Sequence, residues 1–459
     1  MKALLLAGLT AAHLLAATPA AADTLPRKGF LGIGMPPALQ QGAGAVIGDV
    51  LPGGTAATLG LRPGDVVVEA GGEAVRGPAE LAGYAAALTS GAPVTLKVRR
   101  GQRVLQLTGS AAARPLESYG NARVDYGAVP WRGGQLRDIL VTPAGVNAPP
   151  VVFLIQGFTC VSVESPDPAH AYRRLGEELL ARGIAYYRVE KPGLGDSRGT
   201  PRCQEIDYLA ELDAFRAAYR HLVSARAVPP ERIFMLGHSL GGLQAPMLAA
   251  EAAPRGVAVY GTVARNWADY HRDISQFQDF LMRGQDPVAG AQSAEHYRDI
   301  FRLFYLERKA PQEVAALDPA FDAGLRAAFG WDGGTNVFGR HFKYAQDLAH
   351  QPLLAAWRDA RTHVLALYGE ADIVALNDED HRLIADIANH YRPGSGRFVQ
   401  VPATGHGMDR IGTPAQVRAQ ARTSGEVPEG PFNPDVAAAL ARWIGEVMAA
   451  PALAAPEAG

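Results

Sequence analysis

From residue 151 onwards, short apolar runs alternate with longer segments of helical periodicity, and this alternation constrains the fold most. The apolar runs cover residues 151–155, 185–189, 233–236, 257–260, 364–368 and 398–401. The helical patterns fill residues 168–182, 207–224, 240–253, 378–391 and 434–449. Strands that alternate with helices form a mostly parallel sheet covered by helices on both faces, which is an α/β fold. Runs at 122–126 and 136–142 are expected to add antiparallel strands at one edge.

A glycine-flanked serine lies between the strand 233–236 and the helical segment that follows it. The residues are Gly237-His238-Ser239-Leu240-Gly241. A turn this tight leaves no room for side chains two positions before and two positions after the serine, and Gly237 and Gly241 meet that demand. The pattern, in its strand–helix context, predicts a nucleophile elbow that holds the Ser239 hydroxyl above the edge of the sheet.

An acid and a histidine follow the next two strand-like runs. Asp372 comes after the run 364–368, and His406 comes after the run 398–401. Loops at the carboxyl ends of parallel strands meet at one edge of the sheet. With the order Ser, acid, His, residues 115–450 resemble the α/β-hydrolase family. The resemblance implies that Ser239 is the nucleophile, that Asp372 orients the imidazole, and that His406 acts as general base and then general acid.

Other side chains compete for these roles. Glu370 is an alternative acid, although it lies nearer the end of its strand. His381 and His390 fall in a helical pattern and are expected at the surface. His238, beside the serine, is interpreted as a packing residue of the elbow because its side chain should point away from that of Ser239.

The family resemblance also implies an oxyanion hole of two backbone N–H donors. One is Leu240, and the other comes from the loop Gln156-Gly157-Phe158-Thr159. Phe158 matches best, but the family often has His-Gly where this chain has Gln-Gly, so Thr159 stays open. The turn 191–197 resembles a Gly-rich turn common in the family and is interpreted as structural.

The two cysteines, Cys160 and Cys203, follow two strands that are adjacent in the family. The resemblance therefore implies loops over the same rim and, in an oxidising compartment, a disulfide. Two buried free thiols are the alternative. Neither His-Glu-x-x-His nor paired Cys-x-x-Cys motifs occur, so we expect no metal and no cofactor.

About 100 residues separate Val263 from the next strand at Val364, far more than a crossover needs. Residues 265–355 are rich in aromatic residues at helical spacing and are expected to form a helical cap. Most of these aromatic side chains should form the cap's own core, while Trp267 and Tyr270 are candidates to line the substrate pocket.

The first 22 residues have the pattern of a secretory signal peptide. Lys2 precedes an apolar run of roughly 15 residues that ends in small residues, which predicts cleavage after Ala22. We therefore expect a periplasmic or secreted protein. No later run reaches ~18 apolar residues, so no membrane span is expected in the mature chain.

Residues 27–110 contain short strand-like runs separated by turn signals. The motif Gly60-Leu61-Arg62-Pro63-Gly64-Asp65 before the run 66–68 resembles the PDZ domain. The resemblance implies that Leu31, Gly32 and Ile33 bind a peptide carboxylate, beside a groove helix at 79–88. A domain that only packs on its neighbour is the alternative. Residues 111–115 are interpreted as a linker.

The net charge of −2 gives no electrostatic footprint for nucleic acid. The sequence predicts an exported serine hydrolase that cleaves an ester or amide through an acyl-enzyme, as a carboxylesterase, thioesterase or peptidase does. A peptidase would need a carboxylate to hold the substrate amine, for which Glu164, Asp167 and Asp269 are candidates. The alternatives are an inactive envelope scaffold that binds peptides, and an acyltransferase with the same three residues.

Overall fold

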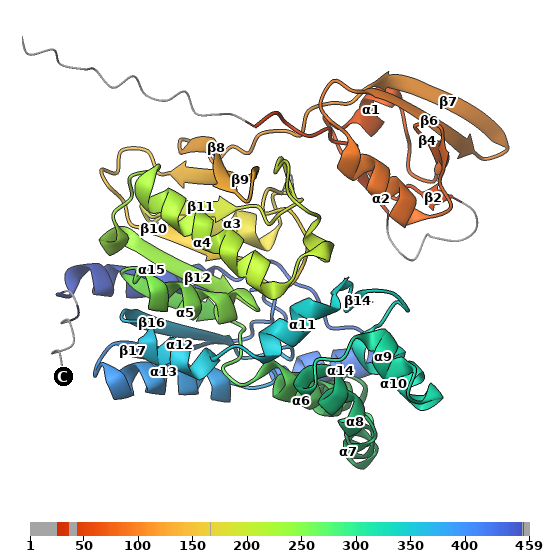
Figure 1. Ribbon diagram of the computed structural model, residues 1–459. Coiled ribbons are helices and arrows are strands. Elements are labelled where there is room, and N and C mark those ends of the chain that lie inside the picture. Colours follow the sequence, from red (N-terminus) through yellow and green to blue (C-terminus); the bar gives the residue numbers. More distant parts are fainter. Residues whose placement is uncertain (1–24, 36–43, 166, 452, 454–459) are drawn as a thin grey trace, which may run out of the picture.

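The computed structural model describes residues 25–35, 44–165, 167–451 and 453. The expected signal peptide, residues 1–22, lies outside the described residues. Two bodies are visible, a small one formed by residues 25–35 and 44–110 and a larger one that contains the long sheet (Figure 1). Among the described residues, no helix is long and apolar enough to cross a membrane.

The larger body is built on an eight-stranded sheet of order β17-β16-β13-β12-β10-β11-β9-β8. The strands are β8 (Arg123–Trp131), β9 (Gly134–Thr142), β10 (Val151–Ile155), β11 (Ala185–Val189), β12 (Ile233–His238), β13 (Gly256–Tyr260), β16 (His363–Gly369) and β17 (Gly396–Val401). In this sheet order, neighbouring strands from β17 through β10 to β11 pair in parallel. Strand β9 pairs antiparallel with both β8 and β11. Both the parallel sheet and its antiparallel edge are therefore as predicted.

Helices cover both faces of the sheet because successive strand residues point to opposite sides. Val151, Phe153 and Ile155 pack with one set of helices, and Val152 and Leu154 pack with the other. The first face carries α4 (Tyr208–Ser224), α5 (Gly241–Glu251), α12 (Leu353–Asp359) and α13 (Glu379–Tyr391). The second face carries α3 (Ala171–Leu180) and α15 (Pro434–Ala449).

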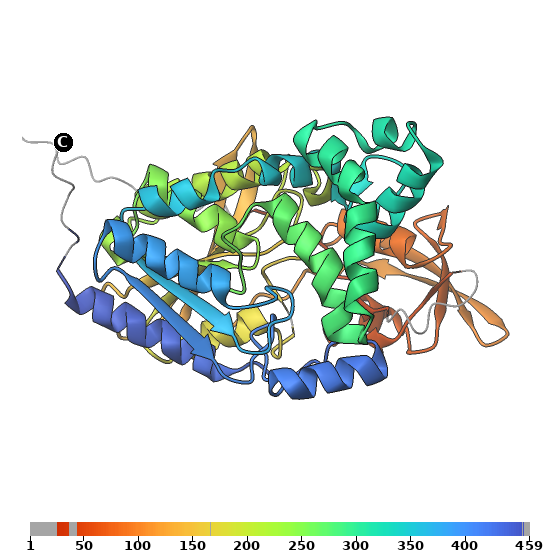
Figure 2. The same cartoon turned by 90° about the horizontal axis from the view of Figure 1, so that it is seen from below.

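A group of short helices is inserted between β13 and β16. It comprises α6 (Trp267–Arg283), α7 (Pro287–His296), α8 (Arg298–Phe301), a π-helical turn (Arg302–Leu306), α9 (Pro311–Ala315), α10 (Pro319–Phe329), β14 (Asn336–Val337), β15 (Arg340–His341) and α11 (Phe342–Ala349). Phe304, Tyr305 and Phe329 are fully buried in the core of this insertion. The helices gather at one end of the sheet, with α14 (Pro414–Ser424) beside α6 (Figure 2). We call this insertion the cap.

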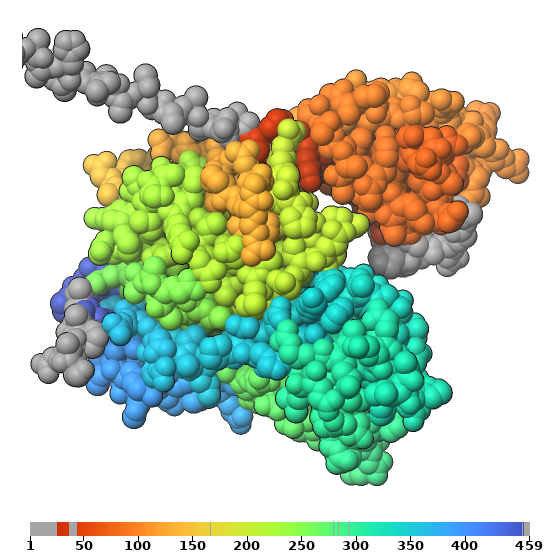
Figure 3. Space-filling view, in the orientation of Figure 1, coloured from red at the N-terminus to blue at the C-terminus, as the bar shows by residue number. Residues whose placement is uncertain are grey.

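The N-terminal body forms a separate lobe in the space-filling view (orange, Figure 3). Its antiparallel sheet contains β2 (Ala45–Val46), β4 (Val66–Ala70), β5 (Glu73–Ala74), β6 (Pro93–Arg100) and β7 (Arg103–Ser110). Its other elements are β1 (Ile33–Gly34), β3 (Asp49–Val50), α1 (Thr55–Leu59) and α2 (Pro78–Ala87). Strands β1 and β3 pair with each other.

The segment around Arg27 joins the two bodies through buried charges. The guanidinium of Arg27 lies 2.6 Å from Asp196 and 2.8 Å from Glu164. Both carboxylates belong to loops of the larger body, and their side chains are at most 1% exposed. The amide of Lys28 also donates to Asp196 at 2.8 Å. The expected linker pairs with the same segment, since Arg114 N donates to Lys28 O at 3.0 Å.

Candidate active site

Ser239 lies in the turn between β12 and α5, in a backbone conformation that side chains rarely adopt. Its φ is 54°, and its amide donates to Tyr260 O at 2.9 Å. A Cβ on Gly237 would lie 2.5 Å from Gly241 O, and one on Gly241 would lie 1.9 Å from Ile155 O. The glycines at these positions are therefore required by the tight turn, for the steric reason that the sequence suggests.

The side chains of Ser239, His406 and Asp372 form one chain of hydrogen bonds. His406 Nε2 lies 3.0 Å from Ser239 Oγ, and His406 Nδ1 lies 2.9 Å from Asp372 Oδ2. The other oxygen of Asp372 accepts from the amides of Val374 and Ala375, both at 2.9 Å. Since β12, β16 and β17 run in parallel, the loops after them bring the three side chains together.

Glu370, the alternative acid, does not reach the imidazole. It accepts a hydrogen bond from the amide of Ala403 at 2.9 Å and so helps hold the loop before His406.

The charges of the pair favour an ionised carboxylate beside the imidazole. Burial would raise the pKa of Asp372, but the charge and hydrogen bond of His406 hold that pKa below its ordinary value. Burial likewise opposes protonation of His406, yet the Asp372 carboxylate raises the His406 pKa above its ordinary value. The imidazole is thus a stronger base than a free histidine, which suits the acceptance of a proton from Ser239.

His238 packs behind the site, as its position in the elbow suggests. Its Nε2 lies 2.9 Å from the carbonyl oxygen of His406, and its Nδ1 lies 2.7 Å from the hydroxyl of Tyr172. Burial lowers the pKa of His238 to about 4, so the ring is neutral at pH 7. A neutral ring with Nε2–H donates to His406 O and accepts from Tyr172, which holds the backbone of His406 in place.

The expectation that His381 lies at the surface is wrong. Its ring is fully buried, and its Nε2 accepts from the amide of Thr262 at 3.2 Å. The reason is the helical repeat of α13, whose inward face includes His381, Ile384 and Ala388. His390, on the same helix, is exposed as expected.

The two amides expected to form an oxyanion hole border the same space as Ser239. Leu240 and Phe158 both line the cavity at Ser239, as does Thr159. Within the described part of the chain, neither Leu240 N nor Phe158 N has a hydrogen-bond acceptor. A Cβ on Gly157 would lie 2.9 Å from Ser239 Cβ, so only glycine lets this loop approach the serine so closely.

The cavity at Ser239 has a volume of about 380 Å³ and an apolar lining. The wall is formed largely by Phe158, Leu240, Trp267, Tyr270, Ile274 and Phe338. His271 also lines it but is neutral, since burial lowers its pKa to about 4. No aspartate or glutamate is among the described residues that line it.

The three candidate amine-binding carboxylates lie elsewhere. Glu164 is buried against Arg27, Asp167 caps a turn through the amide of Ala169, and Asp269 borders a separate groove between the cap helices.

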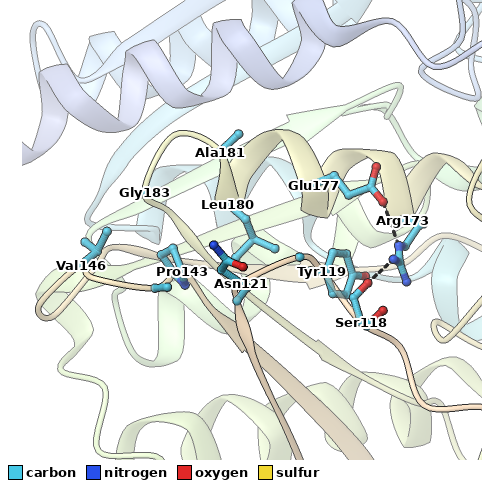
Figure 4. Close-up of a pocket in the computed structure, with 13 residues that line it drawn as sticks. Ser118, Tyr119, Asn121, Pro143, Val146, Arg173, Glu177, Leu180, Ala181 and Gly183 are labelled. Atoms are coloured by element: carbon cyan, nitrogen blue, oxygen red, sulfur yellow. Dashed lines mark hydrogen bonds and ion pairs between the residues drawn. The ribbon is translucent and has the colours of Figure 1, made fainter.

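Another hollow, of about 570 Å³, lies beside α3 and is lined by the segment before β8 and the loop after β9 (Figure 4). Arg173 and Glu177 face it but are paired with each other at 3.1 Å. Its lining shares no residue with the cavity at Ser239. Among the described residues, no three His, Cys, Asp or Glu side chains gather in a way that could hold a metal ion.

The disulfide between Cys160 and Cys203 is present, with Cα atoms 5.7 Å apart. It joins the loop after β10, which carries Phe158, to the 3₁₀ turn Cys203–Glu205 after β11. The disulfide therefore links the loop beside Ser239 covalently to the segment that follows β11.

Sequence reasoning missed a buried charged group next to this loop. Glu211 pairs with both Lys191 and Arg340, and the two cations also bond to the loop's carbonyl groups. Lys191 belongs to the turn interpreted as structural, while Arg340 lies far along the chain, in the cap. A lysine two positions after the strand Ala185–Val189 was the one visible signal.

A model of the alpha/beta hydrolase family matches residues 151–420, and a PDZ domain model matches residues 46–100. The first match spans more than half of the chain, and the chain therefore belongs to the alpha/beta hydrolase family. It also contains a PDZ domain. By family, the chain is a hydrolase.

None of the curated proteins matches the sequence significantly. Among solved structures, the chain is similar to Est1E from Butyrivibrio proteoclasticus with bound ferulic acid, at 17% identity and a TM-score of 0.41 over 64% of this chain and 96% of that one. It is similar to a proline iminopeptidase from Mycobacterium smegmatis, at 18% identity and a TM-score of 0.41 over 71% and 99%. It is also similar to a soluble variant of monoglyceride lipase from Saccharomyces cerevisiae, at 13% identity and a TM-score of 0.43 over 73% and 98%.

Proposed function

We propose that this protein is a serine hydrolase in which Ser239, His406 and Asp372 are the catalytic residues. The observation that carries the proposal is the continuous hydrogen-bonded chain from Ser239 Oγ through His406 to Asp372, at the mouth of an apolar cavity. A serine hydroxyl is a weak nucleophile, and a neighbouring imidazole oriented by a buried carboxylate activates it.

The reaction proceeds in two halves. Ser239 Oγ forms a bond to the substrate carbonyl carbon while His406 Nε2 takes the hydroxyl proton, and the carbonyl oxygen becomes an oxyanion. The N–H groups of Leu240 and Phe158 are proposed to stabilise that charge. His406 then gives the proton to the leaving group, and the acyl-enzyme forms. Water, activated by His406, releases the acid and regenerates Ser239.

The substrate is proposed to be a neutral ester with an apolar acyl or alcohol group. The cavity is apolar, and no described carboxylate lines it to receive a charged amine. Moving an unpaired ammonium group into such a cavity is costly, whereas a neutral ester loses little hydration. The lining therefore supports an esterase over an aminopeptidase.

A fluorophosphonate probe tests the nucleophile. The purified protein should be labelled once per chain, and Ser239→Ala should abolish both labelling and ester hydrolysis. A matched control is Ser275→Ala, because the Ser275 hydroxyl only donates to His271 O within α6. Folded wild-type protein that does not label would favour the inactive scaffold. Activity retained in Ser239→Ala would reject the proposal.

A substrate panel tests the reaction class. Aryl butyrates should be cleaved faster than aminoacyl anilides, and faster anilide cleavage would favour a peptidase. An added alcohol that captures most of the acyl group in preference to water would favour an acyltransferase.

A peptide-binding role is proposed for the PDZ domain. Gly32 has φ +69°, and the carbonyls of Phe30, Leu31 and Gly32 accept hydrogen bonds from Thr55, Ala56 and Leu51. In the described part of the chain the amides of Leu31 and Gly32 have no backbone acceptor, which supports binding of a carboxylate there. Peptides with a free C-terminus should bind, and their amidated versions should not. Equal binding of both would reject this role.

Export and domain limits are proposed from the sequence. The proposed mature chain begins at Asp23, with a PDZ unit at 27–110, a hydrolase unit at 115–450 and a cap at about 265–355. The disulfide is consistent with an oxidising compartment. N-terminal sequencing of the exported protein should give Asp23 first.

A further inference from the structure

Two cations and one carboxylate are buried together behind the loop that carries Phe158. Glu211 lies 2.7 Å from Arg340 and 3.2 Å from Lys191, and all three side chains are at most 2% exposed. Glu211 also accepts from the hydroxyl of Tyr344 at 2.8 Å and from Gln244 at 3.0 Å. Burying charge is costly unless it is paired, so this cluster requires a compensating role or a complete set of partners.

The two cations also donate to three consecutive carbonyl groups of the loop. The Lys191 ammonium donates to Gly157 O, and it also donates to Thr159 O at 3.3 Å. Arg340 Nη1 donates to Phe158 O at 3.1 Å, while its Nη2 donates to Cys203 O at 3.0 Å. Three successive peptide groups are therefore held from the side of the loop where the cations lie.

Peptide planarity transmits this restraint to the amide groups. Gly157 C=O and Phe158 N–H belong to one rigid trans peptide unit and point in opposite directions. A cation that holds Gly157 O on one side therefore fixes the direction of the Phe158 N–H on the other. Arg340 does the same for the next unit, Phe158 C=O and Thr159 N–H. The two cations therefore restrain both candidates for the second oxyanion donor, Phe158 N–H and Thr159 N–H.

The cluster also has an electrostatic effect. With Glu211 ionised it carries one net positive charge behind the loop. Burial lowers the pKa of Lys191 to about 8, so Lys191 is mainly charged at pH 7. A cation on a peptide carbonyl polarises that peptide and strengthens its N–H as a donor. This positive charge behind the loop therefore also attracts the negative charge of an oxyanion that is bound at the N–H groups of the loop.

We propose that Lys191 and Arg340 are positioning residues, which orient the second N–H donor of the oxyanion hole through the carbonyl groups of residues 157–159. This inference rests on the proposed hydrolase function. Because Arg340 belongs to the cap strand β15, the cap also takes part in shaping the oxyanion hole, in addition to enclosing the cavity.

The test compares Lys191→Met and Arg340→Lys with the wild-type protein on an aryl butyrate. Methionine keeps the volume of Lys191 but removes its donors. Lysine keeps the charge beside Glu211 but cannot bond Phe158 O and Cys203 O with the fork geometry of arginine. Lys343→Met is the matched control, because Lys343 is exposed on the cap helix α11.

We expect kcat to fall about 10- to 100-fold in Lys191→Met and about 10-fold in Arg340→Lys, with KM changed less than about threefold. The affinity for a trifluoromethyl ketone, which forms a tetrahedral adduct with Ser239, should fall by the same factor as kcat/KM. The fraction of the protein that a fluorophosphonate labels at completion measures the fraction of active sites that are folded. If labelling of Lys191→Met is incomplete, part of that variant is not folded. The kinetics and ketone affinity of Arg340→Lys then test the proposal by the same criteria.

A kcat within twofold of wild type, or an unchanged ketone affinity beside a reduced kcat, would overturn the positioning role. Those results are distinct from failure of the proposed function, in which the wild-type protein is not labelled or Ser239→Ala remains active.

Discussion

The disulfide offers a quantitative test of how the loops around the site are stabilised. Cys160 and Cys203 are 43 residues apart in sequence. Closing a loop of this length reduces the entropy of the unfolded chain by an amount worth about 4 kcal/mol at 25 °C. The double variant Cys160→Ser, Cys203→Ala removes the bond, with serine at the partly exposed position and alanine at the buried one. We therefore expect a free energy of unfolding lower by about 4 kcal/mol.

The assay is denaturant unfolding followed by circular dichroism and by activity. For a unit the size of residues 115–450, a loss of about 4 kcal/mol corresponds to a fall of about 6 °C in Tm. Wild-type protein reduced with dithiothreitol should lose the same stability, and the variant should not respond to the reductant. If the variant and the fully reduced wild-type protein lose less than about 1 kcal/mol, the entropic argument is refuted.

Three further results are expected at the site. Asp372→Asn should lower kcat/KM by about 10⁴-fold, because the amide favours the wrong imidazole tautomer. Glu370→Gln should retain most of the activity. Similar losses in both variants would contradict the assignment of Asp372 as the acid. Activity should fall as the pH drops through the pKa of His406, which lies above its ordinary value because of Asp372. The midpoint of the acid limb of kcat/KM should therefore lie above ~6.5, and a midpoint well below it would exclude the raised pKa. Gly261→Ala should reduce turnover, since Gly261 has φ +60° and a Cβ there would lie 2.8 Å from Asp372 Oδ2. Wild-type turnover in this variant would show that the pair Asp372 and His406 tolerates displacement.

The parts of the molecule that follow local rules could be predicted from the sequence. Strand and helix periods gave the sheet and its antiparallel edge, because each element is defined by its own residues. The elbow was predicted from the Gly-x-Ser-x-Gly pattern between a strand and a helix, and the structure supplies the steric reason, since a Cβ at Gly237 or Gly241 would collide with backbone. The contact of His406 with Asp372 was implied by the family resemblance, and topology agreed with it, because the ends of parallel strands share an edge.

Contacts between distant segments could not be predicted in this way. Arg340 lies 182 residues after Phe158, and nothing in the sequence around either residue indicates their contact. Lys191 and Glu211 are charged, and charged residues are usually expected at the surface. His381 was expected at the surface of a helical segment, but the helical repeat of α13 includes it in the buried face.

The attachment of Arg27 to Asp196 and Glu164 means that the two units are not interchangeable modules. Both carboxylates are buried within the hydrolase body, yet one guanidinium that pairs with both of them, that of Arg27, comes from the segment entering the PDZ domain. A hydrolase excised at residue 115 would lose both cations that pair with Glu164, Arg27 and Arg114, whereas Asp196 would keep its pair with Arg137. Evolutionary shuffling of either unit would therefore need a compensating substitution in the other.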